Sequence, residues 1–314
     1  PDVVGITSYT VHVNIVNKLF ERIKAFNPDI VTIVGGHHAT VMPDDFFTSS
    51  IDAIVAGEGV FAFQEIISKL EKKTDLSGIP GSRRAGKGAL VIRQEGQAGD
   101  LDALPLPRRD LTARFRKSYS SEWMRPLASI RTSKGCLFKC KFCALWKLTG
   151  GRYLIRKPEC IVEELGAIEE KCIFFADDES LLDSKRMEIL AERIQQAGIK
   201  KRYFLYGRSD TVAKHPELLE KWKKAGLERL FVGLEFMKDA DLKGIHKGST
   251  AENNKTAVKI LKGLDIDIFP TLIVRPDFDR KDFADLRRYC LDLDLQFIGF
   301  PVLTPLPGTD LYND

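Results

Sequence analysis

Length, composition and charge set limits on the protein before any motif is considered. The chain has 314 residues, 44% of them hydrophobic, which suggests about two domains with cores of their own. Its 48 Lys and Arg against 44 Asp and Glu leave a net charge of +4. Like charges form no long block, so a nucleic-acid-binding protein is not indicated. No apolar run approaches the ~18–20 residues needed to cross a bilayer, so we expect a soluble protein.

The chain ends and the cysteines indicate the context of the protein. Residue 1 is Pro rather than Met, and a strand-like pattern begins at once, so we expect a fragment of a longer protein. Six Cys in 314 residues are too few for a disulfide scaffold. This usage favours a reducing, cytoplasmic compartment and a metal site.

The first segment alternates strand and helix patterns. Strands are expected at Val3–Thr7, 29–34 and 53–56, and amphipathic helices at 14–26 and 61–70. Glycines follow the second and third strands, as in an open parallel sheet that binds a ligand at its carboxyl edge. The visible strands are too few for a complete Rossmann-like domain, so residues 1–71 are interpreted as part of one.

A linker and a second domain follow. Residues 72–124 are rich in Pro and Gly breaks and read as a linker, with a short hairpin strand near 89–92. From residue 125 to 314 a strand–helix unit repeats six times, which predicts a (β/α)6 partial TIM barrel. The expected strands are 127–131, 172–176, 203–206, 229–234, 266–274 and 296–302. The expected helices between them are 158–170, 184–197, 216–225, 252–263 and 281–291.

A cysteine motif lies in the loop after the first barrel strand. Cys136, Cys140 and Cys143 have the spacing C-x3-C-x2-C, which lets three thiolates reach one metal centre. A structural zinc site needs four protein ligands, and no fourth Cys or His follows nearby. An iron–sulfur cubane held by three thiolates leaves one iron open, so a catalytic cluster is favoured over three buried cysteines. The other cysteines are interpreted as small buried residues.

This motif resembles the radical S-adenosylmethionine (SAM) superfamily, including the aromatic Phe142 before the third cysteine. The resemblance implies that Cys136, Cys140 and Cys143 hold a 4Fe–4S cluster whose open iron binds SAM. It further implies reductive cleavage of SAM to methionine and a 5′-deoxyadenosyl radical, with an electron donor such as flavodoxin or ferredoxin.

Polar loops after the later strands complete the predicted SAM site. An acidic run, Asp177-Asp178-Glu179, follows the second strand; it faces a cation, a hydroxyl or water, or it caps a solvated helix. Arg208 could pair with a carboxylate through its fork, or form a surface salt bridge. The resemblance assigns SAM contacts to Phe142, Asp177, Asp178, Arg208, Ser209 and Glu235.

The loop after the fourth strand and the N-terminal segment resemble cobalamin-linked members of that superfamily. Glu235, with Lys247-Gly248 downstream, is similar to their Gly-x-Glu-Ser and Lys-Gly pair, although Phe236 replaces the usual Ser. The Gly-rich turns at 35–36 and 57–59 resemble the lower half of a cobalamin-binding domain. Contacts to cobalamin are therefore expected from Thr7, Ser8, Gly35, Gly36, His38, Gly57 and Glu58. The axial cobalt ligand is expected upstream of Pro1.

The resemblance implies cobalamin-dependent methylation of an unactivated carbon. The substrate expected is a small, lipid-like molecule such as a hopanoid, because the turn after the fifth strand, Val274-Arg275-Pro276-Asp277, resembles the hopanoid methylase subgroup. Radical oxidation or cyclisation without methyl transfer remains open, as does a non-catalytic cobalamin- or redox-sensing module. No side chain is assigned as a catalytic acid or base.

Overall fold

The computed structural model describes residues 1–86, 88–93 and 100–314. The chain forms two compact units. The first contains Pro1–Gly99, Phe142–Gly150 and Pro305–Asp314, and the second contains Asp100–Lys141 and Gly151–Thr304. Both are mixed α/β, with largely parallel sheets, as the sequence predicts.

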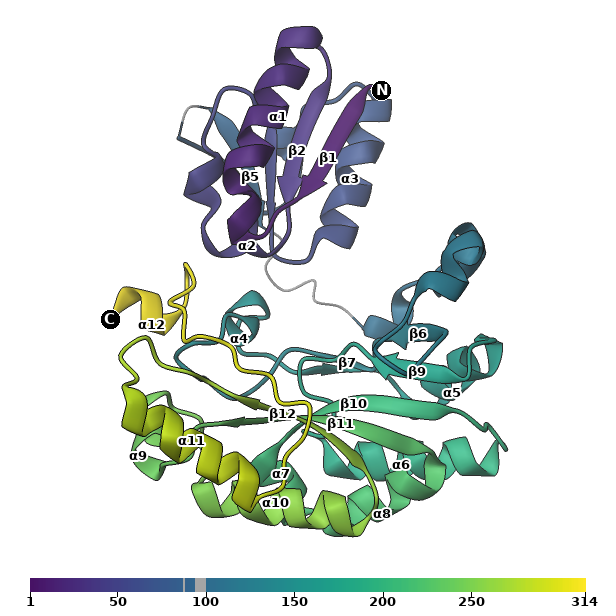
Figure 1. Cartoon of the computed structure of the whole chain (residues 1–314). Helices are drawn as coiled ribbons and strands as arrows, with labels where there is room; N and C mark the ends of the chain where they lie inside the picture. Colours follow the sequence, from purple (N-terminus) through teal and green to yellow (C-terminus); the bar gives the residue numbers. More distant parts are fainter. Residues whose placement is uncertain (87, 94–99) are drawn as a thin grey trace. The chain divides into compact units, whose positions relative to one another are not determined.

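The first unit is a five-stranded sheet with the order β1-β2-β3-β5-β4. Its strands are β1 (Val3–Thr7), β2 (Val31–Gly35), β3 (Ala53–Ala56), β4 (Ser82–Ala85) and β5 (Ala89–Arg93). Its helices are α1 (Val13–Phe26), α2 (His37–Val41), α3 (Gly59–Glu71), α4 (Leu145–Leu148) and α12 (Asp310–Asn313). Apolar side chains on the two faces of the sheet form separate cores, one with Phe20 of α1 and one with Ile66 of α3 (Figure 1). All neighbouring strands run parallel except β4 and β5.

Residues 82–85 and 89–93 correct the expected domain boundary, because they belong to the first sheet rather than to a linker. Val91 and Ile92 are fully buried, and β5 pairs in parallel with β3 from Leu90 to Arg93. Burial on both faces is typical of a strand inside a parallel sheet. The short β5 pattern was too brief to distinguish this arrangement from an isolated hairpin.

The second unit is a parallel sheet with the sequential order β12-β11-β10-β9-β6. Its strands are β6 (Leu127–Ile130), β9 (Cys172–Phe175), β10 (Arg202–Arg208), β11 (Leu227–Glu235) and β12 (Asp267–Leu272), with a separate ribbon of β7 (Ser133–Lys134) and β8 (Leu154–Ile155). The helices are α5 (Pro158–Ala167), α6 (Ser184–Gln196), α7 (Ser209–Lys214), α8 (Pro216–Ala225), α9 (Asp239–Gly244), α10 (Ala251–Gly263) and α11 (Arg280–Asp292). They cover one face of the sheet, and the main core lies between (Figure 1).

The sixth predicted strand, at 296–302, is not formed as a strand. It meets β12 and the residues after it through two isolated parallel bridges, Thr271 to Gly299 and Val274 to Val302. Pro270 and Pro301 have no backbone N–H to donate, so a continuous ladder cannot form here. The structure therefore contains a five-stranded sheet with a sixth segment attached at its edge.

The face of this sheet opposite the helices carries aromatic rings. Phe174, Phe204 and Tyr206 are neighbours, with ring centroids 5.2 Å apart for Phe174–Phe204 and for Phe174–Tyr206. Phe231 lies 4.6 Å from Tyr206 and 5.6 Å from Phe269. Alternation along each strand directs these rings away from the helix-covered core, so the inner face is apolar and aromatic.

Candidate functional site

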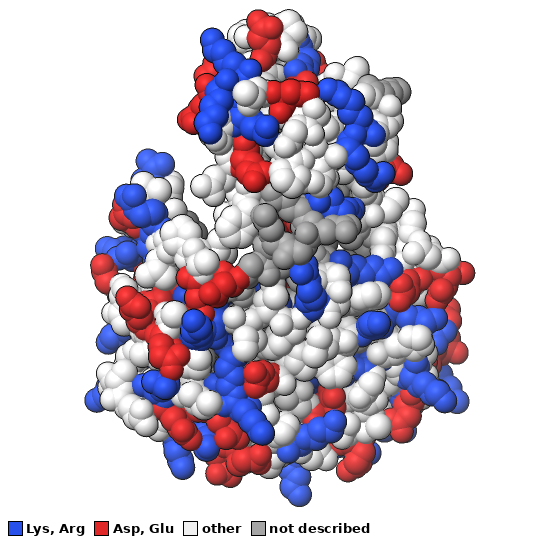
Figure 2. Space-filling model, turned by 180° about the vertical axis from the view of Figure 1, so that it is seen from behind, with Lys and Arg blue, Asp and Glu red and all other residues white. Residues whose placement is uncertain are grey.

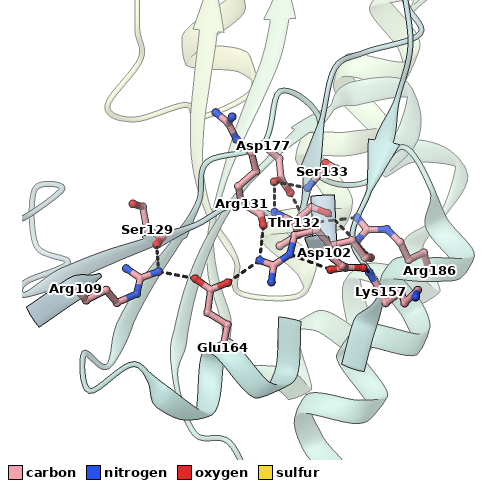
Figure 3. A network of polar contacts seen from close by, with 11 residues as sticks. Asp102, Arg109, Ser129, Arg131, Thr132, Ser133, Lys157, Glu164, Asp177 and Arg186 are labelled. Atoms are coloured by element: carbon pink, nitrogen blue, oxygen red, sulfur yellow. Dashed lines mark hydrogen bonds and ion pairs between the residues drawn. The ribbon is translucent and has the colours of Figure 1, made fainter. Parts of the chain in front are cut away.

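The cysteine loop begins where β6 ends. Its first residues form hydrogen bonds with the acidic run that follows β9. Asp177 is buried and accepts hydrogen bonds from the Thr132 N–H (2.7 Å), the Thr132 hydroxyl (2.6 Å) and the Ser133 N–H (2.8 Å) (Figure 3). Asp178 accepts from the Gly135 N–H at 2.6 Å, directly before Cys136. Both carboxylates thus fix the loop backbone, a positioning role that the sequence did not reveal.

The three motif cysteines form no disulfide bonds, and neither do Cys160, Cys172 and Cys290. Cys140 is buried and Cys136 is partly buried, and burial raises the pKa of the Cys136 thiol. Phe142 and Cys143 belong to the first unit, within Phe142–Gly150. Among the residues that the structure describes, no three His, Cys, Asp or Glu side chains are gathered as metal ligands. Cluster ligation by these thiols therefore rests on their spacing and type.

Arg208 stands beside the cysteine loop at the end of β10. Its Nε donates to Asp210 Oδ1 at 2.9 Å, and an Nη donates to the Lys247 carbonyl. Its other Nη lies 3.9 Å from Cys140 Sγ, and its Cζ lies 3.5 Å from the centre of the Phe138 ring. Arg208 is thus a buried cation in contact with a motif cysteine, not a surface salt bridge. Charge close to a thiolate stabilises it electrostatically.

Glu235 and Lys247 form a second buried ion pair, with Oε1 and Nζ 2.7 Å apart. Glu235 adopts φ 62°, a left-handed conformation that is uncommon for a residue with a side chain. The β11–β12 register shifts between Gly233 and Glu235. A Cβ on Gly233 would lie 2.3 Å from Glu235 Oε1, so the carboxylate fills space that only glycine leaves. Backbone of this kind is found at functional sites, where the surrounding structure holds it in place.

Glu179 belongs to this cluster, although the sequence did not select it as a site residue. It is buried, and burial raises the pKa of its carboxyl to about 7, against the opposing charges of Arg208 and Lys247. Asp210 adds to the rise. The signal was present in the triple acid 177–179, but the convergence of three strands was needed to identify its third member.

The remaining predicted SAM residue is Ser209, the first residue of α7. It is fully buried, and its hydroxyl shares a 3.0 Å hydrogen bond with that of Ser249. Arg208, Ser209 and Glu235 thus lie together at the carboxyl ends of β10 and β11, with Glu179 and Lys247 beside them. Opposed charges and hydroxyls at this edge suit a ligand that carries both an ammonium and a carboxylate.

The residues predicted to contact cobalamin gather at the carboxyl edge of the first sheet. Ser8 donates its N–H to the Gly35 carbonyl at 2.8 Å and accepts from the His38 N–H at 3.0 Å. Gly36 has φ 96°, and a Cβ there would lie 2.4 Å from Thr7 Oγ1. The turn is therefore restricted to glycine, because Thr7 and Ser8 occupy the space that a side chain would need.

His38 is held on both ring nitrogens. Its Nδ1 lies 3.0 Å from Thr10 Oγ1, and its Nε2 lies 2.7 Å from Asp45 Oδ2. This agrees with a hydrogen-bonding histidine rather than a metal ligand, and it locks the ring under the turn.

Gly57 and Glu58 complete this edge. Gly57 has φ 98°, and its N–H donates to Thr40 Oγ1 at 3.0 Å. Glu58 is the N-cap residue of α3. The Gly36 and Gly57 turns both expose backbone at the end of a parallel strand, which fits a large flat ligand such as cobalamin.

Comparison with known proteins agrees with this geometry. The model of the radical SAM superfamily matches residues 130–290, and that of the B12 binding domain matches residues 1–67. The fold and the cysteine loop define a radical SAM protein with a cobalamin-binding segment. The chain belongs to the radical SAM superfamily, whose members use a 4Fe–4S cluster and SAM, and its B12 domain implies cobalamin as a further cofactor.

Among curated relatives, the hopanoid C-3 methylase of Methylococcus capsulatus is 31% identical over all of this chain and 60% of its own length. The anaerobic magnesium-protoporphyrin IX monomethyl ester cyclase of Rubrivivax gelatinosus is 26% identical over all of this chain and 58% of its own. The chain thus spans somewhat over half the length of these relatives.

Two solved structures share the fold. The radical SAM methyltransferase TsrM from Kitasatospora setae, with cobalamin and a 4Fe–4S cluster bound, has a TM-score of 0.74 and 20% identity, over 99% of this chain and 66% of its own. The cobalamin-dependent radical enzyme OxsB has a TM-score of 0.72 and 20% identity, over 100% of this chain and 46% of its own.

Surface features agree with the charge pattern of the sequence. No described helix is long and apolar enough to span a bilayer. Acidic and basic side chains intermingle on the face drawn in Figure 2, which is typical of an ordinary solvated surface.

Proposed function

We propose that the chain is part of a radical SAM enzyme that methylates an unactivated carbon of a lipid-like substrate such as a hopanoid, with cobalamin as methyl carrier. The observation that carries the proposal is the buried cluster of Arg208, Glu235 and Lys247 beside the cysteine loop. Burying such charges is unfavourable without a purpose, and a zwitterionic ligand such as SAM supplies one. The hopanoid methylase among the relatives supports the substrate class.

The side chains have distinct roles in this proposal. Cys136, Cys140 and Cys143 would hold the cluster, since three cysteines within eight positions, none of them in a disulfide, are the donor set it needs. When bound, the cofactors supply a reducing electron, a 5′-deoxyadenosyl radical and a transferable methyl group. Arg208 places a fixed positive charge beside Cys140, and Glu235 offers a carboxylate to an ammonium. An electron donor such as flavodoxin or ferredoxin, and a reducing cytoplasm, would complete the system.

The inner face of the barrel sheet supports an apolar substrate. Tyr206, Phe231 and Phe269 are only partly buried, on the same face as Arg208 and Glu235 by strand alternation. Aromatic rings favour flat or polycyclic hydrocarbons through area and shape. They also exclude water from the neighbourhood of a reactive radical.

The test is product analysis without oxygen. The protein, reconstituted with iron, sulfide and cobalamin, is incubated with SAM, reductant and a hopanoid-containing lipid extract. We expect 5′-deoxyadenosine and S-adenosylhomocysteine together, and loss of both in Cys136→Ala. Cys160→Ala is the matched control, because this cysteine lies outside the motif and should leave iron content and products unchanged. Absence of both products from a protein with an intact cluster would contradict the proposal.

Radical oxidation or cyclisation is the second candidate, supported by the 26% identical cyclase. It requires 5′-deoxyadenosine but no methyl transfer. In the same assay, 5′-deoxyadenosine formed with a magnesium-protoporphyrin ester, without S-adenosylhomocysteine, would favour this chemistry over methylation.

A further inference from the structure

A cavity of about 330 Å³ lies along the β6 edge of the barrel sheet, within the second unit. One wall is apolar and comes from the segment before η5 (Arg109–Ser118), including Leu101, Leu104 and Leu106. The opposite wall includes Ser129 of β6 and Arg131, which directly follows the end of that strand. Its size is at the lower end of the range for small-molecule sites, about 300–1,000 Å³.

The carboxylates at this cavity are already paired. Glu164 is buried and accepts from Arg109 Nη2 at 2.7 Å and from Arg156 Nη1 at 2.6 Å. Arg156 also meets Asp102 at 3.2 Å. Glu164 lines the cavity, whereas Asp102 is not among the lining residues. Together the two carboxylates balance the charges of Arg109 and Arg156, so this network has no net charge (Figure 3).

Arg131 is a third guanidinium and has no such balance. Its Nε donates to the Ala176 carbonyl at 3.3 Å, and its side chain is otherwise exposed. Within the described parts of the chain it joins no ion pair with a carboxylate. In Figure 3 its guanidinium points away from the Asp102–Glu164 network. The cavity therefore has one surplus positive charge, carried by a group whose terminal nitrogens are available.

We propose that this cavity binds a small monocarboxylate with an apolar chain, its carboxylate on Arg131 and its chain against Leu104 and Leu106. A guanidinium fork matches a carboxylate in shape, and one surplus charge matches a monoanion better than a phosphate dianion. The leucines remove the chain from water. None of these residues is assigned to the cluster, SAM or cobalamin, so the site goes beyond the proposed function and is testable without it.

Octanoate is the probe, and isothermal titration calorimetry with the purified chain is the measurement. We expect saturable binding of one octanoate per chain, weakened about tenfold or more in Arg131→Gln, because a charge-assisted bidentate contact is lost. Octan-1-ol, with the same chain and no charge, should bind at least about tenfold more weakly. Leu104→Ser should weaken octanoate while leaving the guanidinium intact.

Arg22→Gln is the matched control, since it removes the same charge from exposed α1 in the first unit. Thermal melting checks that every variant is folded. If Arg131→Gln does not fold, Leu104→Ser still tests the proposal. The proposal is overturned if octanoate does not bind, if octan-1-ol binds equally well, or if Arg22→Gln weakens binding as much as Arg131→Gln.

Discussion

Removing the Lys247 ammonium tests whether the Glu235–Lys247 pair is a coupled, buried unit. Their charged atoms are 2.7 Å apart, and the side chains of Glu235 and Lys247 are 10% and 6% exposed. At an effective dielectric constant of ~20, this separation corresponds to about 6 kcal/mol of attraction before desolvation is subtracted. Lys247→Met would leave the carboxylate buried without its cation, which typically costs about 3–5 kcal/mol.

A double-mutant cycle separates the pair from general damage. Glu235→Gln in the Lys247→Met background removes the stranded charge, so the double variant should recover at least about 2 kcal/mol relative to additivity. The free energy of unfolding is measured by urea titration, followed through tryptophan fluorescence, to which Trp222, fully buried in the second unit, contributes. A coupling energy below about 0.5 kcal/mol would refute the reasoning, because the two residues would then act independently.

Three further outcomes follow from other residues. Burial raises the pKa of Glu179 to about 7 from 4.5, so between these pH values the folded protein binds a proton that the unfolded chain has released. The free energy of unfolding should therefore fall by up to about 3 kcal/mol as pH rises from 4.5 through 7. Urea unfolding at several pH values should show that Glu179→Gln lacks this pH-dependent component. Gly36→Ala should weaken cobalamin retention, measured by visible absorbance after gel filtration, because the new Cβ would lie 2.4 Å from Thr7 Oγ1. In Gly57→Ala the new Cβ would meet no atom within 4 Å, so this variant tests backbone strain alone. Equal losses of cobalamin in the two variants would contradict the clash with Thr7 as the cause. Glu164→Leu removes the ion-pair partner of Arg109 and one of the two partners of Arg156, and should lower stability by about 3 kcal/mol. An unchanged melting temperature would show that these ion pairs are not coupled to folding.

The parts of the site that depend on local spacing could be predicted from the sequence. The cysteine motif and the Gly35-Gly36 turn are each contiguous in the chain, so residue type and interval were enough. The strand–helix alternation was also legible, because each strand of the second sheet pairs with its neighbour in the sequential order. Arg208 and Glu235, which the resemblance assigned to SAM contacts, lie close together in the structure.

Features that depend on distant partners could not be predicted. Asp177 was expected at SAM, yet Thr132 and Ser133 occupy its oxygens from 45 and 44 positions away. Whether Glu179 was solvated or buried depended on two other strands. The sixth strand is not formed because Pro270 and Pro301 lack N–H donors where the two segments pair. The sequence pattern of one segment does not show which residues it pairs with.

The β6 edge has a consequence for how the second sheet assembles. A sheet edge with open carbonyls can recruit a strand from another molecule. Here Arg109 Nη2 donates to the Ser129 carbonyl at 2.8 Å, and the segment that carries Arg109 precedes β6 in the chain. The cover for the first edge is thus synthesised before the edge itself, and every later strand adds beside its predecessor. The edge strand therefore enters folding with its cover already synthesised, which limits its pairing with a strand of another chain.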